Sequence, residues 1–588
     1  MGKVVAIVFI VFIALCGISQ VKADASDHRY KEGDMVPFYV SKVGPFRNPS
    51  ESYRYYDLPF CKPDHLKEKK EALGEVLIGE RLYNASYHLE FRRDKSSKVL
   101  CKKTLKKEEV AKFRSVVQKD YYYEMYYDDL PVWGFIGGLH QKGIDPSDNT
   151  YLYNRIHFDI FYNKDRVIQI NLIPMTRSRV DLTEDKEIDV EFLYSAKWKE
   201  TDTPFEKRRN IYYFHFSSSH WFSIINSCVP SLLLSGFLAA VTLWVLKRDF
   251  VKCALGEESA EGEEVTGWKN LHGDVFRFPK YKCLFAASLG SGTQLFTLTV
   301  FIFILAFFGV FYPYDRGALF TALIVIYALT SVVAGYTATT FYCQLEGMNW
   351  IRNLLFTGFL FAGPLFLTFC FLNTVAIAYN ATIALPFGKV MVIVLIWTLV
   401  ALPLLVLGGL VGKKKNNNNK AEFQAPCRTT SIPREIPPMS WYRRAFCQVA
   451  VAGLLPFGVL CIELDYIFGS LWEYRTFSTY HILFMVFIIL SIVTAAVTVA
   501  LTYFQLAAED HEWWWRSFMY GGSAGAYAFA YCCYYYYARS NISGFLQISF
   551  FFGYMACICY AFFLMLGTLG FHAALLFVRY LYGSIKHE

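Results

Sequence analysis

The sequence predicts a multi-pass α-helical membrane protein with nine transmembrane helices, preceded by a β-rich, sandwich-like lumenal domain. Two observations support this prediction. From Phe222 onward, apolar segments follow one another, each close to the roughly 20 residues that a helix needs to cross a bilayer core. Residues 24–220 are more polar and contain short runs in which apolar and polar side chains alternate, as in half-buried strands.

Residues 1–23 have the features of a secretory signal peptide. Lys3 supplies the positive charge, Val4–Ile18 is a short apolar core, and cleavage is expected near Ala23. Since this core is short for a membrane span, the mature chain is expected to begin in the lumen. The alternative is an uncleaved anchor.

Residues 24–220 are expected to form one domain with its own core. The clearest alternation is in Glu187–Tyr194, and Val110, Phe113 and Val117 have the spacing of one surface helix. The tyrosine-rich run Tyr121–Tyr127 has two interpretations. It is either a binding surface or, as we favour, a strand whose rings pack into the sandwich.

The lumenal domain and two lumenal loops carry candidate sites of covalent modification. Cys61 and Cys101 are the domain's two cysteines, and an oxidising lumen favours one disulfide between them. Asn84, Asn380 and Asn541 each begin an Asn-x-Ser/Thr glycosylation sequon. All three sequons fall on the lumenal side of a nine-span arrangement, the last two close to the bilayer.

The transmembrane domain is expected to occupy residues 221–582, followed by a cytosolic tail at 583–588. Apolar residues continue past 567 to Tyr582, which indicates a long last helix or an added interfacial segment. The loop 413–444 contains eight Lys and Arg residues against two carboxylates and is cytosolic in this arrangement, as the positive-inside rule requires. We expect spans near 222–246, 290–312, 317–342, 354–379, 387–411, 446–469, 480–505, 516–537 and 544–567.

The scarcity of charged residues within the spans argues against a coupled transporter or pump. The middles of the first five spans carry no charge, and Glu463 and Asp465 fall near the lumenal end of the sixth, where snorkelling or water contact is expected. Small-residue pairs such as Gly408/Gly412 and Gly521/Gly525 predict close helix packing. Basic residues cluster in loops, which indicates orientation in a membrane and no nucleic-acid partner.

No enzyme signature is recognisable. The sequence has no HExxH and no pair of mid-membrane aspartates. The segment Glu509–Glu512 contains residue types that bind metals, but side chains at neighbouring positions of a short loop point in different directions. We therefore favour the interpretation as a polar collar, next to an interfacial belt at Trp513–Trp515. We therefore predict no enzymatic activity, no cofactor and no metal.

Motifs along the mature chain resemble those of the nonaspanins, also called the transmembrane nine superfamily or endomembrane protein 70 family, with plant members most similar. The resemblance covers essentially the whole mature chain. The motifs are His28–Asp34, Lys42–Phe46, Tyr53–Cys61, Gly273–Pro279, Leu289–Gln294, Gln344–Gly347, Ala425–Arg428, Tyr503–Trp515 and a terminal Lys-x-Glu.

The resemblance implies a nine-span protein of Golgi and endosome membranes. In the family, a Lys-x-Asp/Glu tail binds the COPI coat and holds the protein in the Golgi; here those positions are Lys586 and Glu588. Members take part in sorting and localising other membrane proteins, notably clients with glycine-rich spans, and in adhesion and phagocytosis. The favoured hypothesis is a cargo escort, and the alternative is a transporter or channel for a small solute or lipid.

Overall fold

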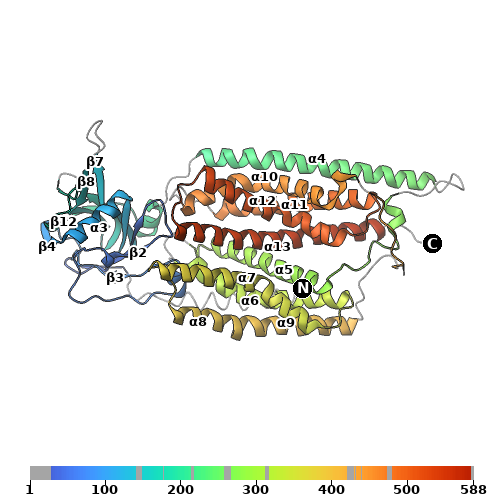
Figure 1. Ribbon diagram of the computed structural model, residues 1–588, viewed down its shortest axis with the longest axis horizontal. Helices are drawn as coiled ribbons and strands as arrows, with labels where there is room; N and C mark the ends of the chain where they lie inside the picture. The colour runs from blue at the N-terminus through green and yellow to red at the C-terminus, as the bar shows by residue number, and fades with distance from the viewer. Residues whose placement is uncertain are drawn as a thin grey trace.

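A computed structural model of the chain describes residues 28–140, 149–175, 178–212, 218–256, 267–311, 317–419, 429–430, 432–438, 440–472 and 480–583. A β-rich domain lies at one end, and a bundle of long helices extends away from it (Figure 1). We call the end of the bundle beside the β-rich domain the near end and the opposite end the far end. This arrangement confirms the predicted fold class.

The β-rich domain is built from three sheets. The first has the order β2-β1-β5-β6, with β3 also on β1: β1 (Phe38–Pro45), β2 (Tyr53–Arg54), β3 (Tyr83–Asn84), β5 (Tyr121–Tyr127) and β6 (Leu130–Phe135). The second has the order β10-β9-β12-β4, with β9 and β12 parallel: β4 (Lys95–Leu105), β9 (Arg155–Asn163), β10 (Arg166–Pro174) and β12 (Ile188–Glu200). The third has the order β11-β8-β7: β7 (Gly137–His140), β8 (Asn149–Tyr153) and β11 (Arg179–Asp181). Short helices connect them: η1 (Tyr55–Asp57), α2 (Leu73–Leu77), α3 (Lys107–Gln118) and η2 (Phe205–Tyr212).

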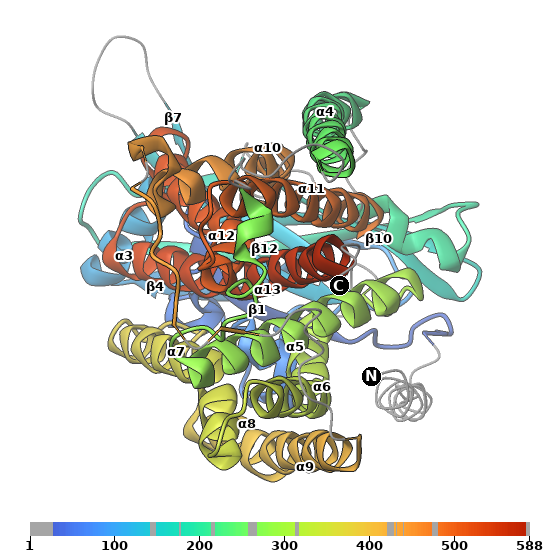
Figure 2. The same ribbon diagram turned by 90° about the vertical axis from the view of Figure 1, so that its right-hand side faces the viewer.

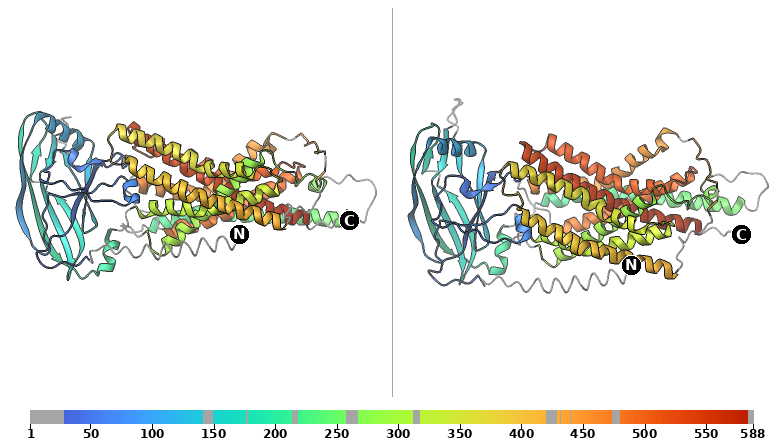
Figure 3. Two further views of the ribbon diagram at one scale, coloured as in Figure 1. Left: turned by 90° about the horizontal axis from the view of Figure 1, so that it is seen from below. Right: turned by 60° about the horizontal axis from the view of Figure 1, so that its bottom comes forward.

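The first and second sheets pack face to face, standing across the end of the bundle (Figure 3). The ring of Phe38 in β1 lies 5.7 Å from that of Phe158 in β9, edge to face. On β12 the alternating side chains Val190, Phe192 and Tyr194 are buried, as the period of two predicted. The core is therefore an aromatic sandwich.

The two features singled out within the domain are both part of this core. Helix α3 buries Val110, Phe113 and Val117, as expected from their spacing. The tyrosine run is the inner strand β5, hydrogen-bonded to β1 and β6, and all five of its tyrosines are buried. The interpretation as a binding surface is therefore wrong, and the interpretation as a packed strand is confirmed.

Nine helical rods of the described chain run the length of the bundle, alternating in direction. Two short turns, η3 (Trp268–Leu271) and η5 (Trp441–Arg443), lie between them. The rods are α4 (Ser218–Gly256), α5 (Lys282–Phe307), α6 (Ala318–Gln344), α7 (Trp350–Ala378), α8 (Phe387–Ile396) continued through η4 (Trp397–Ala401) into α9 (Leu402–Asn419), α10 (Ala445–Trp472), α11 (Tyr480–Ala507), α12 (Trp513–Ala538) and α13 (Phe545–Gly583).

Eight of these rods in the described residues are long and apolar enough to cross a membrane. The remaining rod, α12, is not in this set. Helix α12 is rich in tyrosine, tryptophan and glycine, and it packs against α10, α11 and α13 in the interior of the bundle (Figure 2). Polar atoms on its packed face are therefore met by protein, as the Tyr520 hydroxyl is by Gln448 at 2.6 Å, and it needs less apolarity than a helix that faces lipid all round.

Several spans extend beyond their predicted limits, among them α4, which ends at Gly256, and α9, which ends at Asn419. Helix α5 begins at Lys282 rather than near residue 290, because the small polar residues of its first turns bond back along the helix, as Ser288 does to the Leu284 carbonyl at 2.8 Å. Helix α13 is one continuous helix of 39 residues, which confirms the first of the two expectations for the C-terminal apolar stretch.

Proline and glycine shape the pair formed by α6 and the α8–α9 rod. Pro403 has no N–H for the carbonyl of Leu399, and the helix widens into the π-helical segment η4 just before it. The two helices run parallel, and an added Cβ on Gly408 would overlap the carbonyl oxygen of Val332. The predicted close approach at Gly408 is therefore confirmed, as is that at Gly521, where a Cβ would overlap the Leu566 carbonyl.

Candidate functional site

The β-rich domain is joined to the near end of the bundle by polar contacts, which we call the junction. The Asn48 side chain donates to the Ser543 carbonyl at 3.1 Å and accepts from the Ser543 N–H at 3.3 Å. The Ser50 N–H donates to Oε1 of Gln547 at 3.0 Å, near the start of α13. These are charge-free bonds between segments almost 500 residues apart in sequence.

A second group of junction contacts involves the loop between α7 and α8. The hydroxyls of Ser52 and Thr382 lie 2.6 Å apart, and the Thr382 N–H donates to the Ser52 carbonyl at 2.8 Å. Arg81 donates to the Ala384 carbonyl at 2.9 Å, and Lys389 donates to the Glu71 carbonyl at 3.2 Å. Since Ser52 and Thr382 are both buried, separating the two parts would expose their hydrogen bonds to water.

Glycines make the closest approach of the junction. Gly74 in α2 meets Gly317 at the start of α6, and a Cβ on either residue would overlap the backbone of the other. Gly317 also has a φ of +69°, which disfavours any side chain there. Together the contacts hold the β-rich domain on the bundle in one orientation.

The three glycosylation sequons all lie at the β-rich domain or the near end. Asn84 is in β3, where its side-chain oxygen accepts from the Lys67 N–H at 2.7 Å and its amide donates to the His65 carbonyl at 3.0 Å. Asn380 and Asn541 are exposed, but the hydroxyl residues of their sequons, Thr382 and Ser543, are the junction residues described above. Sequence reasoning identified these positions without indicating that they join the two parts.

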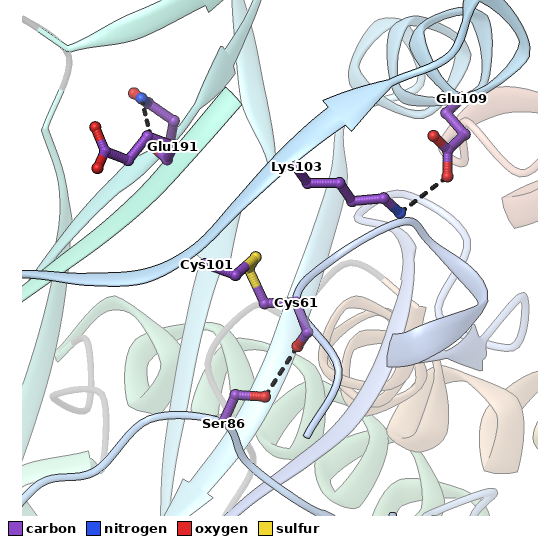
Figure 4. Close-up of a disulfide and its surroundings, with 7 residues drawn as sticks. Cys61, Ser86, Cys101, Lys103, Glu109 and Glu191 are labelled. Carbon is purple, nitrogen blue, oxygen red and sulfur yellow. Dashed lines mark hydrogen bonds and ion pairs between the residues drawn. A yellow bond between two sulfur atoms is a disulfide. The ribbon is translucent and has the colours of Figure 1, made fainter. Parts of the chain in front are cut away.

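Cys61 and Cys101 are linked by a disulfide, with their Cα atoms 6.0 Å apart (Figure 4). The bond ties β4 to the segment that follows η1. The sequon hydroxyl of Ser86 points at the same place and donates to the Cys61 carbonyl at 2.9 Å (Figure 4). Nearby, Lys103 and Glu109 form an ion pair at 2.9 Å, and the Lys103 hydrogen bond lowers the pKa of the Glu109 carboxyl.

The described spans carry their charged side chains toward the two ends of the bundle. In the part of α10 toward the near end, Asp465 accepts a hydrogen bond from the Tyr531 hydroxyl at 3.1 Å. Glu463 is buried, with 1% of its surface exposed, which differs from the expected contact with water. Protein atoms rather than water therefore surround the Glu463 side chain.

At the far end, the cluster Glu509–Glu512 is held in ion pairs. Glu509 accepts from the Gly267 N–H at 2.8 Å and pairs with Arg434 at 2.9 Å, while Asp510 pairs with Arg516 at 2.6 Å. The described residues contain no group of His, Cys, Asp and Glu side chains that could hold a metal ion. The cluster fits the interpretation as a polar collar that ties loops together.

The expectation of an interfacial belt is wrong for Trp513 and Trp514, which are both buried. The Trp513 indole donates to the Val275 carbonyl at 2.7 Å and stacks on Phe571, with ring centres 5.9 Å apart. These rings fill the space between α12, α13 and the segment before α5. A tryptophan run resembles a belt in sequence, and only the packing partners distinguish the two cases.

The first span, α4, lies at the edge of the bundle, with its main contacts on α10 and α11 (Figure 2). Its outward face is apolar: Leu233 and Phe237 are 69% and 70% exposed. Between them Gly236 is exposed, and an added Cβ there would have no atom within 4 Å. We call these three residues the α4 notch, a place where a second helix backbone can approach α4 closely.

The predicted sorting residues Lys586 and Glu588 lie outside the described residues. Helix α13 ends at Gly583 at the far end, opposite the β-rich domain (Figure 1). Its last turn is anchored, because the buried Tyr582 hydroxyl donates to the Trp268 carbonyl at 2.6 Å.

Comparison with known proteins gives consistent results. A family model described as "Endomembrane protein 70" matches residues 52–545. The chain is 67% identical over 589 residues to "Transmembrane 9 superfamily member 3" of Arabidopsis thaliana, covering 99% of both chains. It is 43% identical over 593 residues to "Putative phagocytic receptor 1b" of Dictyostelium discoideum, again covering 99% of both. It is 40% identical over 594 residues to "Transmembrane 9 superfamily member 1" of Mus musculus, covering 98% of this chain and 97% of that one. No solved structure matches the chain significantly.

Proposed function

Because the chain belongs to the nine-span transmembrane 9 superfamily, or endomembrane protein 70 family, we propose that it sorts and escorts other membrane proteins in Golgi and endosome membranes. The β-rich domain would lie in the lumen and the far end in the cytosol. The basic residues support this orientation, since Lys247, Arg248, Arg352 and Lys413–Lys415 all belong to the far end. The name of the Dictyostelium relative, a putative phagocytic receptor, fits a role in handling membrane proteins.

The observation that carries the proposal is the α4 notch. Helices associate in a bilayer chiefly by close van der Waals packing, for which glycine provides room on both partners. Gly236, exposed between Leu233 and Phe237, offers such a place to a client with a glycine-rich span. Helix α4 also follows η2 closely in the chain, so a client on this helix lies beneath the β-rich domain.

Filling the notch tests the proposal. Gly236→Leu should reduce co-purification and correct localisation of a client with a glycine-rich span, because the new side chain keeps the client backbone away. The fold should tolerate the change, since the space is open. Gly363→Leu in α7 is the matched control, because its Cβ position is also free of neighbours within 4 Å. Equal client recovery with both variants would refute a role of the α4 notch.

The C-terminal tail is proposed to set where sorting occurs. Lys586 and Glu588 form the Lys-x-Glu that would bind the COPI coat, presented from the far end by the anchored end of α13. Lys586→Ala should move the protein out of the Golgi without affecting its folding. Unchanged steady-state localisation of this variant would exclude the tail as the retention signal.

A transporter or channel for a small solute or lipid is the second candidate, and the buried carboxylate Glu463 is the observation in its favour. This function predicts uptake into vesicles that contain the purified protein, and its loss in Glu463→Gln. Uptake that is unchanged by Glu463→Gln, or no uptake at all, would leave the escort function as the better explanation.

A further inference from the structure

We propose that the far ends of α5, α6, α7 and α9 bind the phosphorylated headgroup of a phosphoinositide lipid. The inference rests on the proposed orientation, in which the far end faces the cytosolic leaflet. The residues concerned are Lys282, Arg352, Lys413 and Lys414, which we call the far-end basic patch. Nothing in the sorting function described above requires it.

The cations of the patch come from three helices and meet around the loop that joins α6 to α7. Lys282, the first residue of α5, donates to the Leu345 carbonyl in that loop at 2.8 Å. Lys413 of α9 lies over the ring of Trp350, the first residue of α7, with Nζ 4.8 Å from the ring centre. Arg352 is on the same first turn of α7 and is exposed. Both contacts are made by the ammonium nitrogens, so they hold the charges of Lys282 and Lys413 beside this loop.

The patch is not neutralised by carboxylates. Within the residues that the structure describes, Lys282, Arg352, Lys413 and Lys414 form no ion pair, and Glu346 in the neighbouring loop forms none with them. Four other cations of the same end are paired: Arg277 with Asp274, Lys280 with Glu512, Arg434 with Glu509 and Arg516 with Asp510. Since no carboxylate of the described chain neutralises the four patch residues, their charge is available for an anion.

Backbone N–H groups and a buried polar side chain also favour an anion at the patch. Helix α7 begins at the patch, and the side chain of its N-cap residue, Asn349, makes no capping hydrogen bond. The positive end of the helix dipole and its free N–H groups favour a phosphate there. One turn further in, Asn353 is completely buried and neither its amide nitrogen nor its oxygen has a hydrogen-bond partner in the described chain. A buried polar group in this state is costly unless a ligand or water completes it.

The surroundings favour a lipid over a soluble anion. Exposed apolar side chains continue from the patch along the same helices, including Ile351 and Leu355 of α7 and Leu410 of α9. Acyl chains can lie on these faces while the headgroup meets the cations. Several unpaired cations match a headgroup with additional phosphate groups better than a headgroup with a single charge, and basic pockets at cytosolic helix ends bind such lipids.

Binding can be measured with the purified full-length protein in phosphatidylcholine nanodiscs that contain a fluorescent phosphatidylinositol phosphate. Each cation contributes about 1 kcal/mol near a membrane surface, so Arg352→Gln/Lys413→Gln should weaken binding about thirtyfold. Arg443→Gln/Arg444→Gln is the matched control, because it removes two exposed charges before α10, and it should bind like the unchanged protein. Arg352→Lys/Lys413→Arg should retain most of the affinity, which separates loss of charge from misfolding.

Three results would overturn the proposal. One is an equal loss in the patch variant and the control variant, which would indicate attraction by net charge alone. Another is equal binding of phosphatidylserine at matched total charge. The third is displacement by a soluble inositol phosphate with the affinity of the lipid, since the acyl chains would then contribute nothing. No client or coat is present in this assay, so failure of the sorting function would not affect its result.

Discussion

Asp128 lies in a buried cluster that closes the β-rich domain, and we expect Asp128→Asn to destabilise this domain strongly. Its carboxylate accepts from Arg208 at 2.6 Å and from the Tyr30 hydroxyl at 2.6 Å, and His28 Nδ1 lies 2.7 Å away. The side chains of Asp128 and Arg208 are only 1% and 4% exposed. Through these bonds the first described residues and η2, the last element before α4, are held to the end of β5.

The expected loss of stability follows from the buried charge that the substitution leaves without a partner. Asparagine keeps the backbone in place, because Asp128 has a φ of +48° and asparagine tolerates this conformation. It removes the negative charge and leaves the Arg208 guanidinium buried without its partner. Breaking a buried ion pair in this way costs about 3–5 kcal/mol. Arg208→Met in the same chain should recover part of the loss, since no stranded charge remains.

Hydrogen exchange of the full-length protein, followed by mass spectrometry, measures this effect in residues 205–212. Since 1.4 kcal/mol corresponds to a factor of ten, exchange of protected amides there should accelerate at least about a hundredfold. Asp185→Asn is the control, because Asp185 pairs with Arg114 but is 60% exposed, and such pairs contribute at most about 1 kcal/mol. If the two variants exchange at similar rates, the cluster does not hold this segment and the reasoning fails.

Three further changes test other parts of the fold. Replacing Cys61 and Cys101 by serine should cost about 4 kcal/mol, from the closure of a loop with a sequence separation of 40, and should lower the thermal midpoint of the β-rich domain; a midpoint equal to that of the unchanged protein would contradict the cross-link. Gly408→Leu should separate α6 from α9 and yield aggregated protein in size-exclusion chromatography, whereas Gly388→Leu, in open space, should elute normally; normal elution of both would argue against close packing. Because the pKa of Glu109 is lowered in the folded state, its contribution should be present above pH about 4.3 and lost as the pH falls through the folded pKa. Glu109→Gln should therefore reduce the acid dependence of stability by about 0.2–1 kcal/mol; an unchanged acid profile would refute this role.

Much of the architecture was predictable because it depends on local periodicity. Alternation at Glu187–Tyr194 corresponds to β12, and the apolar segments correspond to nine rods, including the tyrosine-rich α12. The junction was not predictable, because Ser52 and Thr382 are small polar residues of a kind common in loops, and 330 positions separate them. Ion pairs also join residues that are distant in sequence. That Arg352 and Lys413 lack a carboxylate partner could therefore be recognised only from the tertiary structure.

The sequence by itself determined the order of the parts, the number of spans and the uneven distribution of charge between the two ends, because length and hydropathy are properties of short segments. The tertiary structure alone decided that Trp513 and Trp514 are core residues, that two sequons lie at the junction, and that Gly236 is open while Gly408 is not. The physical reason is that burial and pairing belong to residues brought together by folding. Identical residue types therefore differ in role according to what packs against them.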